Sequence, residues 1–121
     1  MSNINDAYGG FVVSNHVLNG VPIRYTYREK SHIPQLNGWH VLSEADDDDY
    51  IRDPAHFTIV SAETAIKLSP LLLVLFHAPY GTNLFWRTAE GIPTGFYDLN
   101  QNRETSIEEI LNGTDNKEEQ D

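Results

Sequence analysis

Short runs in which hydrophobic residues alternate with polar ones dominate this chain, and long helical repeats do not occur in it. The runs hold four to six residues and are bounded by Gly, Pro or Asn, which is typical of strands. Strands joined by short turns pair with their neighbours, so the pattern predicts a mainly antiparallel sheet. The predicted strands are residues 10–14, 23–28, 39–42 and 57–60, with a final hairpin of residues 83–88 and 95–99.

The clearest alternation lies in residues 23–28. Side chains point to opposite faces of a strand in turn, which separates this run into an apolar set and a polar set. The apolar set is expected to face the core, so Tyr25 and Tyr27 are predicted to be buried. The two sets are Ile23, Tyr25 and Tyr27 against Arg24, Thr26 and Arg28.

Helix signals are fewer and shorter. One helical turn is expected over residues 15–19, ending at Gly20, and a short helix over residues 46–52. The aspartates of this second helix fall in its first turn, where the helix dipole stabilises negative charge. Ser61 is a good cap for a third helix, whose apolar residues are spaced to cover one face. These residues are Ala62, Ala65, Ile66 and Leu68.

Two further segments depend on local signals. The apolar run 71–76 follows Ser69-Pro70, and proline favours the first position of a helix, but a buried strand fits the run equally well. Residues 105–108 read Thr-Ser-Ile-Glu and fit a capping box. The helix behind this box is expected to present one apolar stripe and to stop at Asn112-Gly113. The stripe consists of Ile107, Ile110 and Leu111.

Strands combined with two or three short helices on one side predict an α+β domain. A chain of 121 residues is one domain, long enough to bury about two-thirds of its unfolded surface. Its ends are poor in hydrophobic residues. We therefore expect a flexible N-terminus over residues 1–9, the domain over residues 10–112, and a disordered acidic tail over residues 113–121.

Several classes of protein are excluded by composition. The chain has no cysteine, which excludes disulfides, thiolate metal sites and cysteine nucleophiles, and favours the cytoplasm. The N-terminal MSNINDAYGG lacks the basic and apolar regions of a signal peptide. The longest apolar run is too short to span a bilayer. We expect a cytoplasmic protein without a membrane partner.

The net charge of −10 is concentrated in two blocks. Residues 44–53 hold six acids against Arg52, residues 103–121 hold seven acids against two bases, and the rest of the chain is neutral. Nucleic acid is itself anionic and is a poor partner for such a surface. A basic protein is a suitable one, because complementary fields accelerate encounter.

The run Asp46 to Asp49 has two interpretations that the sequence leaves open. It is either a surface that docks on a basic partner or a solvated acidic start of a helix. A calcium loop does not fit, because Ile51 stands where glycine is needed and Phe57 where a bidentate glutamate is needed.

The two tryptophans differ in their predicted positions. Trp39 follows a glycine and opens an apolar strand, so we expect it in the core. Trp86 and its neighbour Phe85 face opposite sides of a strand, so one of the two rings lies outside and is available to a partner.

Catalytic and metal-binding signatures are not found. The five histidines lack the spacing of metal ligands, and no glycine-flanked serine of the nucleophile-elbow type occurs. We predict no catalytic residue, no metal site and no cofactor. The alternative is an enzyme or small-ligand binder built from His40, Glu44 and the nearby aspartates, converging only in the fold.

Six segments in sequence order resemble one family. They are FVVS, PIRYTYRE, GWHVLSEADDDDYIRDP, FTIVSAETAIKLSP, HAPYGTNLFWR and a VLNG turn between the first two. The most specific element is Gly-Trp, a short strand, then the acidic run ending in Tyr and Asp-Pro. The chain is similar, over roughly Gly10 to Arg87, to immunity domain number thirty-three of bacterial polymorphic toxin systems.

The resemblance implies a cytoplasmic inhibitor that binds and neutralises a cognate toxin, and that is not an enzyme. The charge suggests that this toxin is basic, and the sequence does not indicate an oligomeric state. Toxin contacts are expected at the acidic segment and at one exposed aromatic. The predicted partner-binding residues are Glu44, Asp46, Asp47, Asp48, Asp49, Tyr50, Asp53 and Trp86.

Overall fold

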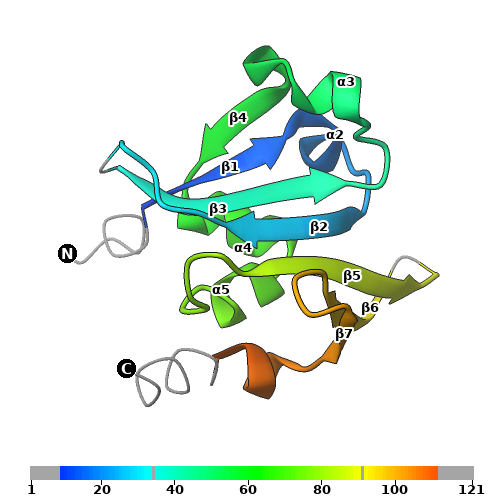
Figure 1. Ribbon diagram of the computed structural model, residues 1–121. Coiled ribbons are helices and arrows are strands. Elements are labelled where there is room, and N and C mark those ends of the chain that lie inside the picture. The colour runs from blue at the N-terminus through cyan, green and yellow to red at the C-terminus, as the bar shows by residue number, and fades with distance from the viewer. Residues whose placement is uncertain (1–8, 34, 91, 112–121) are drawn as a thin grey trace.

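One seven-stranded sheet carries the fold in the computed structural model, which describes residues 9–33, 35–90 and 92–111. The strand order is β4-β1-β3-β2-β5-β6-β7 (Figure 1), and only the β1–β3 pair is parallel in this part of the chain. The predicted α+β class with a mainly antiparallel sheet is confirmed. The strands are β1 (Gly10–Ser14), β2 (Ile23–Arg28), β3 (Leu36–Ser43), β4 (Phe57–Val60), β5 (Asn83–Ala89), β6 (Ile92–Asp98) and β7 (Arg103–Thr105).

Short helices cover one face of the sheet. α4 lies behind β1, β3 and β2 in the view of Figure 1, and the face turned toward the viewer carries no helix over these strands within the described residues. The core lies between the sheet and the helices and includes Phe11, Val41, Leu72 and Leu75. The helices are α2 (Asn15–Leu18), α3 (Asp48–Ile51), the 3-10 turn η1 (Pro54–His56), α4 (Ala62–Leu68) and α5 (Leu71–Val74).

The apolar run after Pro70 is a helix, so the alternative of a buried strand is wrong. The amides of Leu73 and Val74 donate to the Pro70 carbonyl at 3.1 and 3.4 Å, as in a helical first turn. Proline suits this position because its own missing amide proton would have no partner there. The predicted cap is also present, since Ser61 accepts a hydrogen bond from the Thr64 amide.

The C-terminal helix begins one residue later than the sequence pattern suggested. Thr105 closes β7, a strand that was not predicted, and Ser106 is the cap. The Ser106 hydroxyl accepts from the Glu109 amide at 3.2 Å, so Glu109 rather than Glu108 occupies the third position of the capping box. Residues 107–111 are helical, and Ile110 is buried in the core.

The faces of β2 are the reverse of the prediction. Thr26 pairs with Val41 on one side and Leu84 on the other, and its side chain is completely buried with the core. Tyr25 and Tyr27 therefore lie on the open face, and the prediction that they are core residues is wrong. The cause is an irregularity in register between Ile23 and Tyr25, which lets Ile23 stay buried while the next residues change sides.

Arg28, which was expected outside, lies on the core side and joins three segments. Its Nε donates to the Asn37 carbonyl at 3.0 Å, and its Nη1 donates to the carbonyls of Phe76 and Ala78 at 2.6 and 2.9 Å. The guanidinium carbon lies 4.5, 5.0 and 5.8 Å from the ring centroids of Tyr80, Phe76 and Trp39, respectively. Burial lowers the pKa of Arg28, and interaction with Tyr80 opposes that shift.

Gly38 and Trp39 form the junction between β3 and this arginine. Gly38 has φ +92°, and a Cβ atom built on it would lie 2.3 Å from the Glu29 carbonyl oxygen. Only glycine fits, because both the backbone conformation and the close approach exclude a side chain. Trp39 is buried as predicted, and its Nε1 donates to the Phe76 carbonyl at 3.1 Å.

Trp86, and not its neighbour Phe85, is the ring of β5 that faces the core. It is 1% exposed, and its Nε1 donates to the Thr26 hydroxyl at 2.9 Å. Phe85 is therefore the ring on the open face, where Tyr25 packs edge-on against it at 5.2 Å between ring centroids.

The ends of the chain lie outside this description. Most of the flexible N-terminus predicted for residues 1–9, and all of the acidic tail predicted for residues 113–121, fall on residues that the structure does not describe. Within the described ranges, every helix falls short of the length and apolar content needed to cross a bilayer.

Replacing Gly38 with alanine should destabilise the fold by about 2–4 kcal/mol, since the change adds left-handed backbone strain and a clash with the Glu29 carbonyl. The matched control is Gly20→Ala. Gly20 has φ +102° but has no atom within 4 Å of the added Cβ, so strain alone of about 1–2 kcal/mol applies. Urea denaturation measures both, and equal losses would mean that the close approach costs nothing.

Candidate functional site

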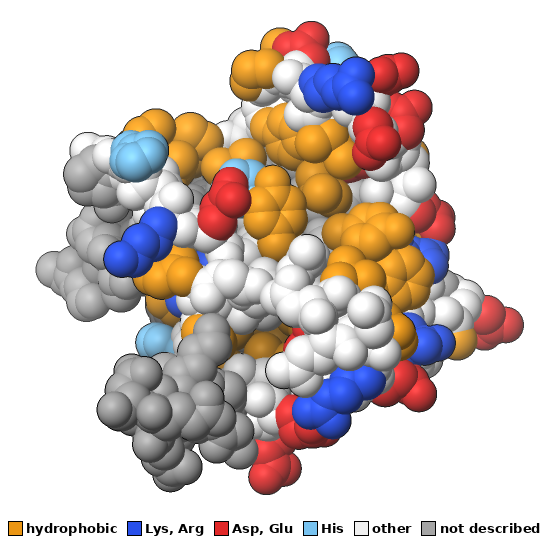
Figure 2. Space-filling model, viewed as in Figure 1, with side chains coloured by type: hydrophobic (Ala, Val, Ile, Leu, Met, Phe, Trp, Pro, Cys, Tyr) orange, Lys and Arg blue, Asp and Glu red, His pale blue; other side chains and the backbone are white. Residues whose placement is uncertain are grey.

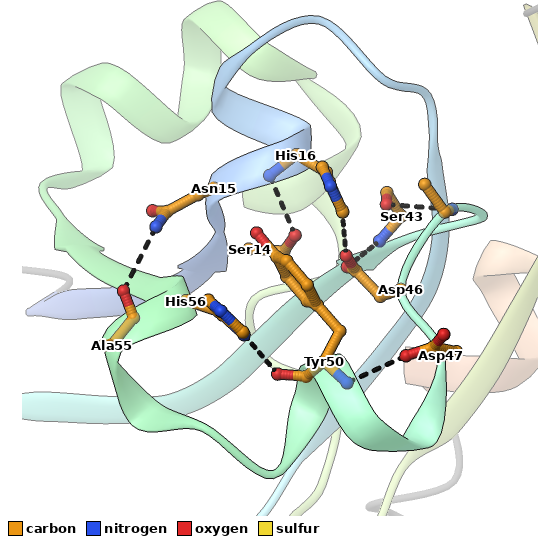
Figure 3. A network of polar contacts seen from close by, with 10 residues as sticks. Ser14, Asn15, His16, Ser43, Asp46, Asp47, Tyr50, Ala55 and His56 are labelled. Carbon is orange, nitrogen blue, oxygen red and sulfur yellow. Dashed lines mark hydrogen bonds and ion pairs between the residues drawn. The ribbon is translucent and has the colours of Figure 1, made fainter.

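The acidic segment folds into a compact end of the sheet. β3 ends at Ser43, the chain turns, and α3 and η1 follow in quick succession beside α2 (Figure 3). The Asp46 amide donates to the Ser43 carbonyl at 3.2 Å, which closes the turn. The four aspartates that look alike in the sequence thereby enter different environments.

Asp46 is a structural residue. Its side chain is 0% exposed, its Oδ2 accepts from the Ser43 amide at 2.7 Å, and its Oδ1 lies 2.6 Å from Nδ1 of His16. The expectation that Asp46 belongs to an exposed patch is therefore not met. Its carboxylate instead ties the turn after β3 to α2, which begins directly after β1.

The balance of forces on Asp46 favours the ionised form. Burial acts to raise the pKa of this carboxyl, but hydrogen bonds from the Ser14 hydroxyl, the Ser43 backbone and His16 outweigh it, and the pKa is lowered. Ser14 is fully buried and belongs to this network. Its hydroxyl also accepts from the His16 amide at 3.1 Å.

The other three aspartates face solvent. Asp47 caps α3 by accepting from the Tyr50 amide at 2.8 Å, while Asp48 and Asp49 occupy the first turn. The predicted placement of aspartates at a helix start is confirmed, although the helix begins at Asp48 rather than Asp46. Asp49 has a side chain that is 91% exposed and lies 3.4 Å from Arg52, a solvated pair of little energetic consequence.

Tyr50 lies between two histidines. Its ring stacks on His16 at 4.2 Å between centroids and on His56 at 4.0 Å, with interplanar angles of 17° and 12° (Figure 3). His56 is held by a contact of 2.8 Å between its Nδ1 and the Tyr50 carbonyl. Through these two contacts Tyr50, a predicted site residue, links α2, α3 and η1. Tyr50 is half-buried, so part of its surface stays accessible.

Glu44 and Asp53 complete the acidic segment. Glu44 pairs with Arg24 at 2.6 Å, and Asp53 caps η1 by accepting from the Ala55 amide at 2.9 Å. Both carboxylates are about half exposed. His40, which was combined with Glu44 in the enzyme alternative, contacts its own strand at the Gly38 carbonyl and stacks on Tyr27 instead.

A hollow on the open face of the sheet adjoins this segment. It has a volume of about 390 Å³ and is formed by β1, β2, β3 and β4 together with the last residue of α3 and the residues that follow it. Figure 2 shows hydrophobic side chains gathered across this face, with acidic side chains at the top right, where α3 lies in Figure 1. The lining residues are Val12, Tyr27, His40, Ile51, Arg52, Pro54, Phe57 and Ile59.

Sequence reasoning missed this hollow. Part of the signal lies in the sequence, because Val12 is an apolar residue between the core residues Phe11 and Val13. The pairing of β1 with β4 is needed to place Ile59 beside Val12 on the same face. Apolar side chains on both faces of adjacent strands indicate that both faces are in contact with something. The predicted exposed ring, Trp86, does not reach this surface, because it is buried on the other side of the sheet.

Burial disfavours the charged forms of His40 and Tyr27, the two stacked rings that line the hollow. Burial lowers the pKa of His40, against smaller opposing effects of the Gly38 carbonyl and Glu29. Burial also raises the pKa of Tyr27, with Glu29 adding to the shift. The two rings are stacked 4.5 Å apart and both are uncharged near neutral pH. Among the described residues there is no group of three or more His, Cys, Asp or Glu that could hold a metal ion.

The buried Asp46 carboxylate should make the free energy of unfolding depend on pH. Asp46→Asn should lower the free energy of unfolding by about 1–3 kcal/mol at pH 7, because it removes charge-assisted hydrogen bonds. The folded-state pKa lies below the unfolded value of about 3.9, so the contribution is complete above that value and is lost as the pH falls through the folded pKa. Wild type and variant should therefore converge in acid.

The control for this measurement is Asp49→Asn, which changes the same chemical group at an exposed position. Urea denaturation at several pH values should leave this variant close to wild type throughout. A constant difference between Asp46→Asn and wild type from pH 7 to pH 2 would contradict the assignment.

Comparison with known proteins gives one match. The family model described as Immunity protein Imm33 domain matches residues 11–94. A search of curated proteins and a search of solved structures each found nothing that matches. The matched range is more than half of the chain and contains α3, η1 and all residues that line the hollow on the open face. This chain therefore belongs to the Imm33 immunity protein family.

Proposed function

We propose that this chain is a cytoplasmic immunity protein that binds a basic cognate toxin through its acidic end and thereby neutralises it. Membership of an immunity family supports the role of toxin neutralisation. The observation that carries the proposal further is the exposed carboxylate cluster around α3. Its members project from one short segment and outnumber the bases there. They are Glu44, Asp47, Asp48, Asp49 and Asp53, against Arg52.

The members of this cluster are available to different degrees. Asp47 and Asp53 accept hydrogen bonds as helix caps and Glu44 is paired with Arg24, yet all three remain exposed. Asp48 and Asp49 have no capping role. Partner binding through these two residues costs the fold least, so we assign them the main electrostatic role.

The physical role of the cluster is attraction before contact. Like charges held close together produce a field that attracts a basic partner and raises association rates by about 10 to 1,000-fold at low salt. Rapid association suits an inhibitor that must capture its toxin before the toxin acts. Such steering weakens with ionic strength, because the Debye length is about 8 Å at physiological salt.

Neutralising Asp48 and Asp49 to asparagine should slow association with the toxin by about 3- to 10-fold at low salt and flatten its salt dependence. The matched control is Glu90→Gln with Glu108→Gln, which makes the same change in net charge at exposed positions away from α3. Stopped-flow mixing with the inactivated toxin encoded beside this gene measures both. Equal slowing in both double variants would mean that net charge, and not the α3 cluster, attracts the toxin.

The function itself is tested by co-expression. The chain should restore growth to cells that express the toxin encoded beside its gene, and the two purified proteins should form a complex of defined stoichiometry. Failure to restore growth against every toxin encoded in the neighbourhood would overturn the proposal.

A further inference from the structure

We propose that the hollow on the open face of the sheet receives an apolar or aromatic side chain of the toxin, one that is flanked by lysine or arginine. This inference rests on the proposed function and adds the second half of the interface. The acidic cluster attracts the toxin, and the hollow holds it. The two parts adjoin, because Ile51, Arg52 and Pro54, which line the hollow, lie in the chain next to Asp49 and Asp53 of the cluster.

The hollow is apolar where a partner would enter. Ile59 lies in β4 at the edge of the sheet, is 60% exposed, and is one of several apolar side chains that together line the hollow. Its Cγ2 atom lies against Gly10, the residue of β1 whose added Cβ would come within 2.8 Å of it. Val12, Phe57 and Tyr27 extend the apolar surface inward from this edge.

Two stacked rings form the inner wall. His40 and Tyr27 lie 4.5 Å apart with an interplanar angle of 5°, so together they present a flat, rigid surface. Neither ring is charged near neutral pH, because burial lowers the pKa of His40 and raises the pKa of Tyr27. A flat uncharged wall binds an apolar or aromatic side chain well, because little polar surface must be desolvated. The volume of about 390 Å³ accommodates one large side chain with its neighbours.

The charges at the rim select the flanking residues. Arg52 lines the hollow and lies 3.4 Å from Asp49 in an exposed ion pair. A toxin cation placed there replaces Arg52 as the partner of Asp49, so no new charge is buried. Asp53 is exposed and lies in the chain between Arg52 and Pro54, which both line the hollow, so a second toxin cation can pair with it there. A second copy of this chain is disfavoured as the occupant, because it would bring a like-charged acidic segment to the same rim.

Truncating the edge side chain tests the inference. Ile59→Ala should raise the dissociation rate of the complex with the inactivated toxin encoded beside this gene by at least about 10-fold, the effect expected for a hot-spot residue. The association rate should stay within about 2-fold of wild type, since no charge changes. Surface plasmon resonance measures both rates. Folding of the variant is checked by its thermal unfolding midpoint.

The matched control is Ile92→Ala. Ile92 is 65% exposed, also lies in a strand and does not line the hollow, so its truncation should leave both rates unchanged. An unchanged dissociation rate for Ile59→Ala, or equal increases for both variants, would overturn the inference. Analytical ultracentrifugation of the free protein tests the other occupant, and a dimer that Ile59→Ala dissociates would also overturn it.

The two proposals fail in different ways. If the wild-type chain binds no toxin, both are overturned together. If it binds, and the Asp48 and Asp49 variant associates slowly while Ile59→Ala dissociates normally, the acidic docking surface stands and the hollow is excluded as the anchor site.

Discussion

The hydrogen bonds of the Arg28 guanidinium are the constraint on which the rest of this structure depends. A half-buried cation needs acceptors, and its three bonds go to backbone carbonyls of β3 and of the segment after α5, with no carboxylate of the described residues paired to it. Removing one acceptor would leave a charged donor unsatisfied, which is among the costlier defects in a protein. The sheet and the helical layer are therefore joined at a point where neither can shift alone.

This constraint gives a physical reason for the Gly-Trp pair that marks the family resemblance. Gly38 lets β3 approach Glu29 closely enough to present the neighbouring carbonyl to Arg28, and Trp39 shares the Phe76 carbonyl with the same guanidinium. The pair thus supports the core, and neither residue is among those that line the hollow. The segment after it, which begins on the same strand, is exposed to solvent and is the part that we propose binds the toxin.

Sequence reasoning reached the element types and the class of fold, because strand length, proline, glycine and caps are local signals. It failed where long-range geometry decides. The reversed faces of Tyr25 and Arg28 follow from a single register irregularity that no pattern in β2 reveals. The site could be predicted in part. The acidic run pointed to α3, but the burial of Asp46 follows from the pairing of β1 with β3, and the hollow on the open face follows from the pairing of β1 with β4.

The unequal roles of the four aspartates also limit how this gene can change. A replication slip that deleted one aspartate would leave Asp at three consecutive positions and look nearly silent in an alignment. The structure makes it a severe lesion, because Tyr50 and His56 would both move one position closer to Asp46, while Asp46 and Tyr50 must both still reach His16. The length of this tract is therefore as strongly constrained as its composition, and in our proposal substitutions at Asp48 or Asp49 are the changes that alter toxin binding at least cost to the fold.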